Sequence, residues 1–297
     1  MNRILFVGDI SWDMSFLTPR VPGPDEKVHV DGFVEGLGGV ACNAAVAAAR
    51  ADAQVLFLGV CGTDILSQGA SDALAASGIE AHLATRDGSI CRVVTMIEGH
   101  GEKRLLLYPG VSLYPAERDL EMIDWDRVDH VHTAVYGTSA RSLIAAARLK
   151  GATWSLDLEP STFPGGIADL DYAIDGAALV IVNDRAAEAI GEGAVATLLS
   201  MGAKTVIRSR GPEGATWTDG RDSFSVPVPD DLDIVDTTGA GDCLAGWYLA
   251  GLSKDLSPKH ALTDAVHAAS LSCRAVGAQA GYPTQQELDN KKGTDRQ

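Results

Sequence analysis

Seven consecutive residues in the last quarter of the chain constrain its fold more than any other stretch. They are Asp236-Thr237-Thr238-Gly239-Ala240-Gly241-Asp242, and an apolar segment, Cys243 to Leu252, follows them. Small and polar residues before an apolar run predict the start of a helix, with Thr238 as its N-cap. The first-turn amides of such a helix have no intrahelical acceptor, so an anion can bind there with the helix dipole behind it.

Asp242 is the unusual residue of this stretch, because a carboxylate at such a helix start has two interpretations. It can simply complement the helix dipole, an effect worth about 0.3 to 1 kcal/mol. It can also orient or deprotonate an attacking hydroxyl while the amides of Gly239, Ala240 and Gly241 stabilise a moving phosphoryl group. The glycine-rich surroundings favour the second interpretation, phosphoryl transfer.

The same stretch resembles the second signature of the ribokinase family of carbohydrate kinases, also called the PfkB family, which reads D-T-x-G-A-G-D. The resemblance implies that Asp242 is the catalytic base and that Gly239, Ala240 and Gly241 form the anion hole. In many members, the residues at the positions of Asp236 and Thr238 also hold a monovalent cation such as K⁺. Carbonyl groups of a terminal loop, here Gly277-Ala278-Gln279, complete that site and adjoin the adenine.

A second resemblance lies in Gly36-Leu37-Gly38-Gly39-Val40-Ala41-Cys42-Asn43, which opens an alanine-rich helix expected to end near Arg50. The glycines also fit a dinucleotide fingerprint, but they do not directly follow the first strand, and the next strand ends without the acid that would hold a ribose. They match the family's G-G-x-x-x-N signature better. That match implies that Gly38 and Gly39 let the sugar approach the backbone and that Asn43 binds a sugar hydroxyl.

Asp13 follows the first predicted strand, Asn2 to Val7, in what reads as a polar turn from Gly8 to Asp13. The family resemblance implies that its carboxylate binds two hydroxyl groups of the sugar, for which two acceptor oxygens are suited. The alternative is a turn aspartate that caps its own backbone.

Asn183 ends a predicted strand and matches the first residue of the family's N-x-x-E motif, which acts on Mg²⁺ and the phosphates through water. The resemblance makes Asn183 a nucleotide-site residue. Ala186 stands where the Glu belongs, so the Mg²⁺ ligands stay unassigned. Asp184, Glu188, or water and phosphate alone are the alternatives.

A turn from Ser209 to Gly214 resembles the family's nucleotide-lining T-x-G-x-x-G motif, with Ser in place of Thr. The resemblance implies that Ser209, Gly211 and Gly214 contact the nucleotide, together with Gly239 and Gly241. A plain strand-turn-strand connection accounts for these glycines equally well.

Strands and helix-length segments alternate along much of the chain, which predicts an α/β fold with a mostly parallel sheet and helices on both faces. Strands are expected at residues 55–60, 128–135, 153–158, 179–183 and 205–209, and helices at 139–150 and 257–276. Two segments, at about 27–35 and 91–108, break this rhythm, and the second contains a hairpin around residues 98–102. We expect them to form a small β-sheet lid. The kinase domain then spans residues 1–285, and the polar tail 286–297 is expected to fray.

Composition excludes several classes of protein. The formal net charge is −16, with 24 Lys and Arg against 40 Asp and Glu, which argues against a nucleic-acid partner. No apolar run is long enough for a membrane span, and no signal peptide is indicated, so we expect a soluble cytoplasmic protein. The five cysteines are widely spaced and are expected to be small buried residues.

Together these features predict an ATP- and Mg²⁺-dependent kinase that phosphorylates a primary hydroxyl of a small sugar, such as a fructose-like ketohexose or ribose. The alternatives are an acidic or sulfonated sugar, a nucleoside, or a non-catalytic nucleotide or sugar sensor. An acidic sugar would need a cation in the lid, and Arg104 is the candidate if its strand register turns it inward. Because an apolar lid is marginal alone, we also expect a homodimer through the lid.

Overall fold

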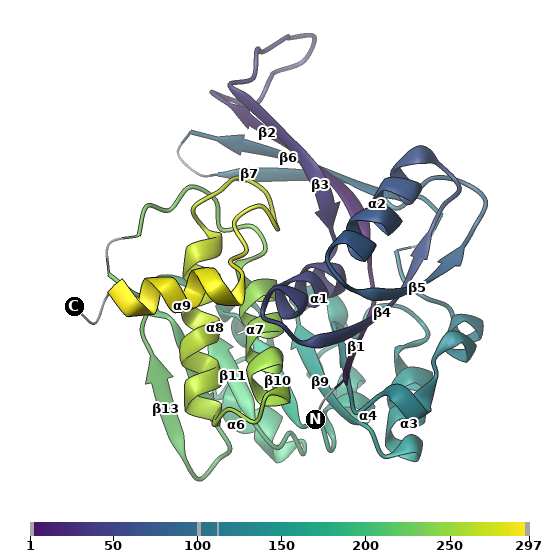
Figure 1. Ribbon diagram of the computed structural model, residues 1–297, viewed down its shortest axis with the longest axis vertical. Coiled ribbons are helices and arrows are strands. Elements are labelled where there is room, and N and C mark those ends of the chain that lie inside the picture. Colours follow the sequence, from purple (N-terminus) through teal and green to yellow (C-terminus); the bar gives the residue numbers. More distant parts are fainter. Residues whose placement is uncertain (1–2, 100–101, 112, 231, 295–297) are drawn as a thin grey trace.

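The computed structural model describes residues 3–99, 102–111, 113–230 and 232–294, and it contains a nine-stranded sheet and a separate four-stranded sheet (Figure 1). The larger sheet has the strand order β13-β12-β11-β10-β9-β8-β1-β4-β5. Its strands are β1 (Arg3–Val7), β4 (Gln54–Cys61), β5 (Glu80–Thr85), β8 (His130–Thr133), β9 (Thr153–Leu158), β10 (Leu179–Val182), β11 (Val206–Ser209), β12 (Ala215–Thr218) and β13 (Ser223–Val226). All neighbours pair in parallel except β11-β12 and β12-β13.

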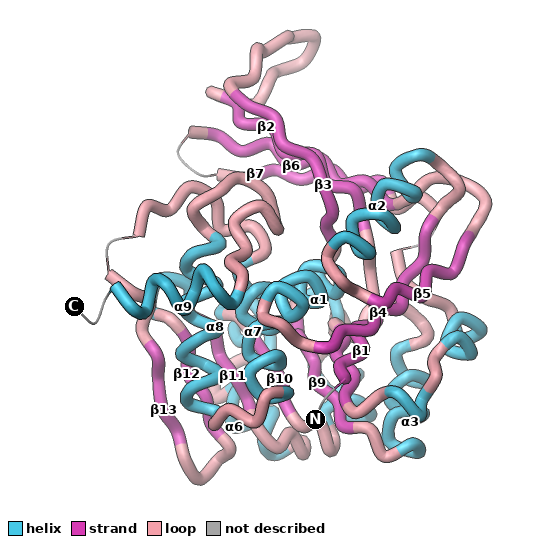
Figure 2. The backbone as a smooth tube through the Cα atoms, viewed as in Figure 1, coloured by secondary structure: helices cyan, strands magenta, loops and turns pink. Residues whose placement is uncertain are grey.

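Helices cover both faces of this sheet (Figure 2). They are α1 (Val40–Arg50), α2 (Ile65–Ala76), α3 (Ala140–Lys150), α4 (Asp171–Ile174), α5 (Asp184–Ile190), α6 (Ala194–Ser200), α7 (Ala240–Ser253), α8 (Pro258–Ser272) and α9 (Gln285–Thr294). Alternate residues of β1 belong to different cores: Ile4 and Phe6 pack with α1, α7 and α8, whereas Leu5 and Val7 pack with α3 and its neighbours. Burial on both faces explains why β1 is continuously apolar.

The four-stranded lid has the order β3-β2-β6-β7 and extends from one end of the body (Figure 1). Its strands are β2 (Ser11–Thr18), β3 (Gly32–Gly38), β6 (Cys91–Glu98) and β7 (Lys103–Tyr108). The mostly parallel sheet and the lid confirm the predicted fold class. His100 and Gly101, in the predicted hairpin, lie outside the described residues.

The lid is larger than the sequence indicated. Residues 11–13, predicted as part of a turn, begin the strand β2, which pairs with β3 on one side and β6 on the other. Residues 27–31 are not in a strand, and β3 begins only at Gly32. The predicted turn after β1 is therefore shorter than expected and covers residues 8–10. In it, the Asp9 carboxylate accepts hydrogen bonds from the amides of Val40 and Ala41 at 2.9 and 3.1 Å.

The helix predictions need smaller corrections. Helix α1 ends at Arg50 as expected, but α8 ends at Ser272, before the predicted end at residue 276. The tail expected to fray forms α9 as far as Thr294. The edge strands β5 and β13 were not predicted.

The five cysteines are free and buried, as expected. Within the described part of the chain, the helices are too short or too polar to span a membrane.

Helices α1 and α7 come unusually close. A Cβ atom added at Gly246 of α7 would lie 2.3 Å from the carbonyl oxygen of Ala44 in α1, a distance that no side chain tolerates. Glycine therefore permits this approach of the two backbones. The contact brings the first turns of the two helices together at one end of the sheet.

Candidate active site

The start of α7 forms an open cluster of amides. Gly239 is the N-cap residue, with φ of 76°, and no side chain caps the helix, so the predicted cap role of Thr238 is wrong. The Thr238 hydroxyl instead donates to Asp236 at 2.7 Å. The amide of Ala240 donates to the Thr237 carbonyl at 3.3 Å, and among the described residues no acceptor is found for the amides of Gly241 and Asp242. This end of the helix can therefore bind an anion.

The Asp242 carboxylate is held by a chain of amide side chains. Asn43 donates from Nδ2 to Asp242 Oδ2 at 2.8 Å, and Gln279 donates from Nε2 to Asn43 Oδ1 at 2.8 Å. Asn43 therefore orients Asp242 directly, a contact that the sequence did not predict. The sequence pointed to only one member of this chain of contacts beyond Asn43 and Asp242: Gln279 belongs to the terminal loop that the family resemblance indicated.

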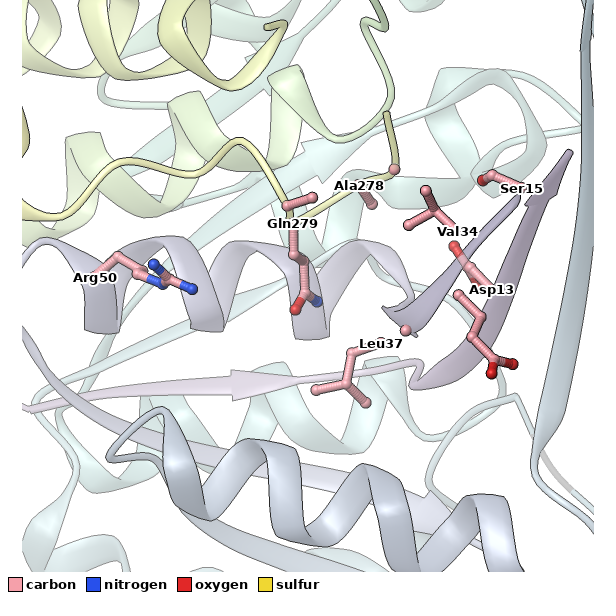
Figure 3. Close-up of a pocket in the computed structure, with 11 residues that line it drawn as sticks. Asp13, Ser15, Val34, Leu37, Arg50, Ala278 and Gln279 are labelled. Atoms are coloured by element: carbon pink, nitrogen blue, oxygen red, sulfur yellow. The ribbon is translucent and has the colours of Figure 1, made fainter. Parts of the chain in front are cut away.

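Asp13 lies on β2 beside a pocket of about 230 Å³, in which Ser15 and Val34 also face the loop of Ala278 and Gln279 (Figure 3). Its carboxylate accepts a hydrogen bond from the Ser11 hydroxyl at 2.6 Å. A Cβ atom at Gly38 would lie 2.1 Å from this carboxylate. Only glycine leaves room for Asp13 there, so the two predicted sugar-site residues are adjacent.

Gly39 is the N-cap residue of α1, with φ of 98°, and a Cβ atom there would lie 2.7 Å from the carbonyl oxygen of Asp9. The glycine pair thus allows the turn from β3 into α1 to pass over the end of β1. This turn places Asn43 within reach of Asp242.

Several carboxylates at this edge of the sheet influence one another. Burial, with a smaller contribution from the nearby Asp9 charge, raises the pKa of Asp13 to about 6, although the hydrogen bond from Ser11 lowers it. Burial is also the main reason that the pKa of Asp242 lies well above its ordinary value, and the charge of Asp157 is the next cause. Burial and the charge of Glu159 raise the pKa of Asp157 itself to about 7. A protonatable carboxylate therefore adjoins the amides of α7.

Asp157 and Glu159 were not predicted as site residues. Both stand at the carboxyl end of β9, where the ends of parallel strands meet, and this position was a usable signal. Glu159 accepts a hydrogen bond from the hydroxyl of Tyr136, whose ring stacks on Tyr114 with the ring centroids 5.1 Å apart. Acidic and aromatic side chains thus line one side of the site.

An apolar cavity of about 580 Å³ opens on the other side of the α7 start. Of the residues predicted for the nucleotide, it is lined by Ser209, Gly211, Gly214 and Gly241, whereas Asn183 and Gly239 are not part of its wall. The wall also includes residues that the sequence did not indicate, among them Val228, Pro229, Leu232, Ile234, Val266 and Ala269. An apolar cavity beside free amides fits a nucleotide base and its phosphates.

The motif around Asn183 differs from the family pattern in its contacts. Asn183 caps α5, since its Oδ1 accepts a hydrogen bond from the amide of Ala186 at 2.8 Å. Ala186 itself is fully buried in the apolar core. Asp184 is bound by Arg208, at 2.7 and 3.0 Å. Of the alternatives predicted for Mg²⁺, Asp184 is thus already paired, whereas Glu188 and water with phosphate stay predictions. Two residues that were not predicted, Asp157 and Glu159, offer the hard oxygen ligands that this ion prefers.

The predicted monovalent cation site holds a side chain of this protein. The Lys103 ammonium group lies 2.5 Å from Asp236 Oδ1 and 2.6 Å from Thr238 Oγ1. These two residues therefore do not fit a K⁺ ion in this conformation.

Arg104, the next residue of β7, faces the other way. Side chains alternate across a strand, so Lys103 fixes Arg104 on the outer face of the lid. There it forms ion pairs with Glu98 and Glu102 at 2.5 and 3.1 Å. The register that the sequence left open thus turns Arg104 away from the site.

Comparison with known proteins agrees with this geometry. The sequence model of the pfkB family carbohydrate kinases matches residues 1–285 of this chain. Mouse ribokinase is 25% identical, covering 96% of this chain and 93% of its own. An ATP-dependent ribose-1-phosphate kinase of Halopiger xanaduensis is 27% identical, covering 94% and 95%. A putative ribokinase II from E. coli, solved with ATP and Mg²⁺, superposes with a TM-score of 0.85 over 99% of this chain and 100% of its own, at 17% identity.

The chain belongs to the pfkB family of carbohydrate kinases. It is an ATP-dependent sugar kinase with the ribokinase fold.

The electrostatic coupling of Asp157 to Asp242 gives a testable pH dependence. Asp157→Asn removes a negative charge that raises the pKa of Asp242, so this pKa should fall. If ionised Asp242 is the reactive form, kcat/KM rises with pH through this pKa, and the acidic limb of the profile should move to lower pH in the variant. Kinetics across pH measure the shift. Asp72→Asn, on the exposed face of α2, is the matched control and should leave the limb in place. An unmoved limb in Asp157→Asn would contradict the coupling.

Proposed function

We propose that this kinase transfers the γ-phosphate of ATP to a primary hydroxyl of a small neutral sugar, with a fructose-like ketohexose or ribose as the best candidates. One observation carries the proposal: the Asp242 carboxylate is oriented by Asn43 at an amide-lined helix start, with the Asp13 pocket and the apolar cavity nearby. The two substrates would approach Asp242 from different sides.

The chain's own groups have distinct roles in this proposal. Asp13 accepts hydrogen bonds from two sugar hydroxyls, and Asn43 keeps Asp242 directed at the third, reacting hydroxyl. Asp242 takes the proton as the sugar oxygen bonds to the γ-phosphorus, while the bond from that phosphorus to the bridging oxygen of ADP breaks. The amides of Gly239, Ala240 and Gly241 stabilise the charge on the transferred group. Asp157 and Glu159 would hold the Mg²⁺ ion that accompanies ATP, which would supply positive charge to the phosphates.

The first test is Asp242→Asn. The asparagine side chain has nearly the same size as the aspartate, and its oxygen can still accept the hydrogen bond from Asn43. It cannot accept the proton, so kcat should fall by about 10² to 10⁴ while ATP still binds. Turnover is measured with a coupled ADP assay, and nucleotide affinity is measured by calorimetry. Turnover within about threefold of the wild type would remove Asp242 as a base. Absence of sugar phosphorylation in the wild type itself would favour a sensor.

Electrostatics support a neutral acceptor over an anionic one. Burial is the largest cause of the raised carboxyl pKa values in this region, and the negative charges of Asp9, Asp157 and Glu159 add to it. An acid or sulfonate on the sugar would add a further negative charge. Arg104, the cation considered for such a ligand, is paired with glutamates on the outer face of the lid.

Steady-state kinetics with paired acceptors test this preference. We expect kcat/KM for fructose or ribose to exceed that for an aldonic or sulfonated sugar by at least about tenfold, a difference of 1.4 kcal/mol in transition-state binding. Arg104→Ala should leave the ratio unchanged, because its side chain faces away. The reverse preference, abolished by Arg104→Ala, would overturn both the neutral acceptor and the assigned orientation.

We further propose a homodimer through the outer face of the lid. Asp13 lies on the inner face, so alternation places the following residues on the outer face: Met14, Phe16, Phe33, Val94, Met96, Leu106 and Tyr108. Phe33, Leu106 and Tyr108 are 49%, 63% and 57% exposed. The same alternation places Glu35, Arg92, Glu98 and Arg104 on this face as well. The apolar part of the face favours burial, and a second copy of the same face provides a complementary surface.

Sedimentation of two matched variants tests the dimer. The wild type should sediment at twice the 31.1 kDa chain mass at micromolar concentration, and Leu106→Glu should shift it towards the single chain. Leu149→Glu is the control, since Leu149 is 84% exposed on α3, away from the lid. A wild type that sediments as a single chain would refute the dimer.

A further inference from the structure

The hairpin of the lid makes a buried ionic contact with the body. Lys103, the first residue of β7, reaches the loop before α7, where its ammonium group contacts Asp236 and Thr238. The Asp236 side chain is completely buried, and that of Lys103 is 24% exposed. A buried carboxylate is costly without a countercharge, so this contact determines whether Asp236 can remain ionised.

Asp236 is also the point at which two loops are joined. Its Oδ1 accepts hydrogen bonds from the amide and hydroxyl of Thr238 at 2.9 and 2.7 Å, and its Oδ2 accepts one from the amide of Gly277 at 2.9 Å. Gly239 follows directly and is so close to the second loop that a Cβ atom would lie 2.4 Å from the Ala278 carbonyl oxygen. The position of the α7 amides therefore depends on this carboxylate and its countercharge.

We propose that the Lys103 ammonium group serves as the built-in monovalent cation of this kinase, so that an external K⁺ ion is not needed and closure of the lid completes the anion hole. An ammonium group is a compact cation with three N–H donors. Two oxygen atoms of the predicted cation site, Asp236 Oδ1 and Thr238 Oγ1, already contact it. Within the described residues, Lys103 is the cation that contacts Asp236. The proposal rests on the proposed role of the α7 amides in phosphoryl transfer.

The location of Lys103 links this charge to the lid. Lys103 is part of β7, and by alternation Leu105 and Leu107 share its face, the one that carries Asp13. Movement of β7 away from the body withdraws the ammonium group and leaves Asp236 buried without its countercharge. Lys103 is thus a positioning residue, which acts on the reaction through Asp236 and the amides that follow it.

Cation dependence tests the proposal. The wild-type sugar kinase should turn over equally fast with tetramethylammonium or K⁺ as the only monovalent cation. Lys103→Met removes the charge but keeps an apolar stem, so kcat should fall at least about tenfold, because one partner of a buried pair is lost. Added K⁺ or NH₄⁺ should restore much of the loss in a saturable way, whereas tetramethylammonium, which is too large, should not.

Arg104→Met is the matched control, because this neighbouring cation pairs with glutamates on the opposite face and should show neither the loss nor the rescue. Thermal unfolding gives a readout that does not depend on turnover: K⁺ should raise the Tm of Lys103→Met and leave that of the wild type unchanged. A wild type activated by K⁺, or a Lys103→Met protein whose Tm is insensitive to K⁺, would overturn the proposal. If K⁺ raises the variant's Tm but no sugar is phosphorylated by any form, the cation role stands and the proposed function fails.

Discussion

The hydrogen bond between Asn43 and Asp242 depends on the close packing of α1 against α7. The two residues are 199 positions apart, and their helices approach closely because Gly246 has no side chain to separate them from Ala44. The parallel sheet beneath orients both helix starts towards the same edge. One backbone contact thus brings together a carboxylate, an amide side chain and the amides of Gly241 and Asp242, for which the described part of the chain offers no acceptor. Any residue larger than glycine at position 246 would separate them.

Much of this arrangement could be predicted from the sequence, because it is encoded locally. The start of α7 follows from a short glycine-rich stretch before an apolar run, and the α/β alternation follows from buried strands between helix-length segments. Asp13 and Gly38, each predicted for the sugar site, lie together, since the carboxylate occupies the space that a side chain at Gly38 would need. Local patterns of this kind are read correctly when few long-range contacts compete with them.

The features that were missed depend on partners far along the chain. Residues 11–13 look like a turn until β6, about eighty residues later, pairs with them. Thr238 is of a residue type that often caps helices, but its hydroxyl donates to Asp236 and accepts from Lys103 instead. The direction in which Arg104 points depends on the strand register of β7, which its pairing with β6 fixes. No local pattern contains this information, because each case is decided by tertiary contacts.

The contrast between Asp236 and Asp242 shows what the fold achieves electrostatically. Burial raises the pKa of both, but Lys103, the Gly277 amide and Thr238 outweigh it at Asp236, whose pKa is lowered overall. At Asp242 the hydrogen bond from Asn43 only partly offsets burial and the charge of Asp157, so its pKa stays high. Environments that move two carboxyl pKa values apart separate a structural anion from a group able to exchange a proton. One of the groups that lower the pKa of Asp236 is a cation from the lid, so we expect movement of β7 to change the charge balance beneath it.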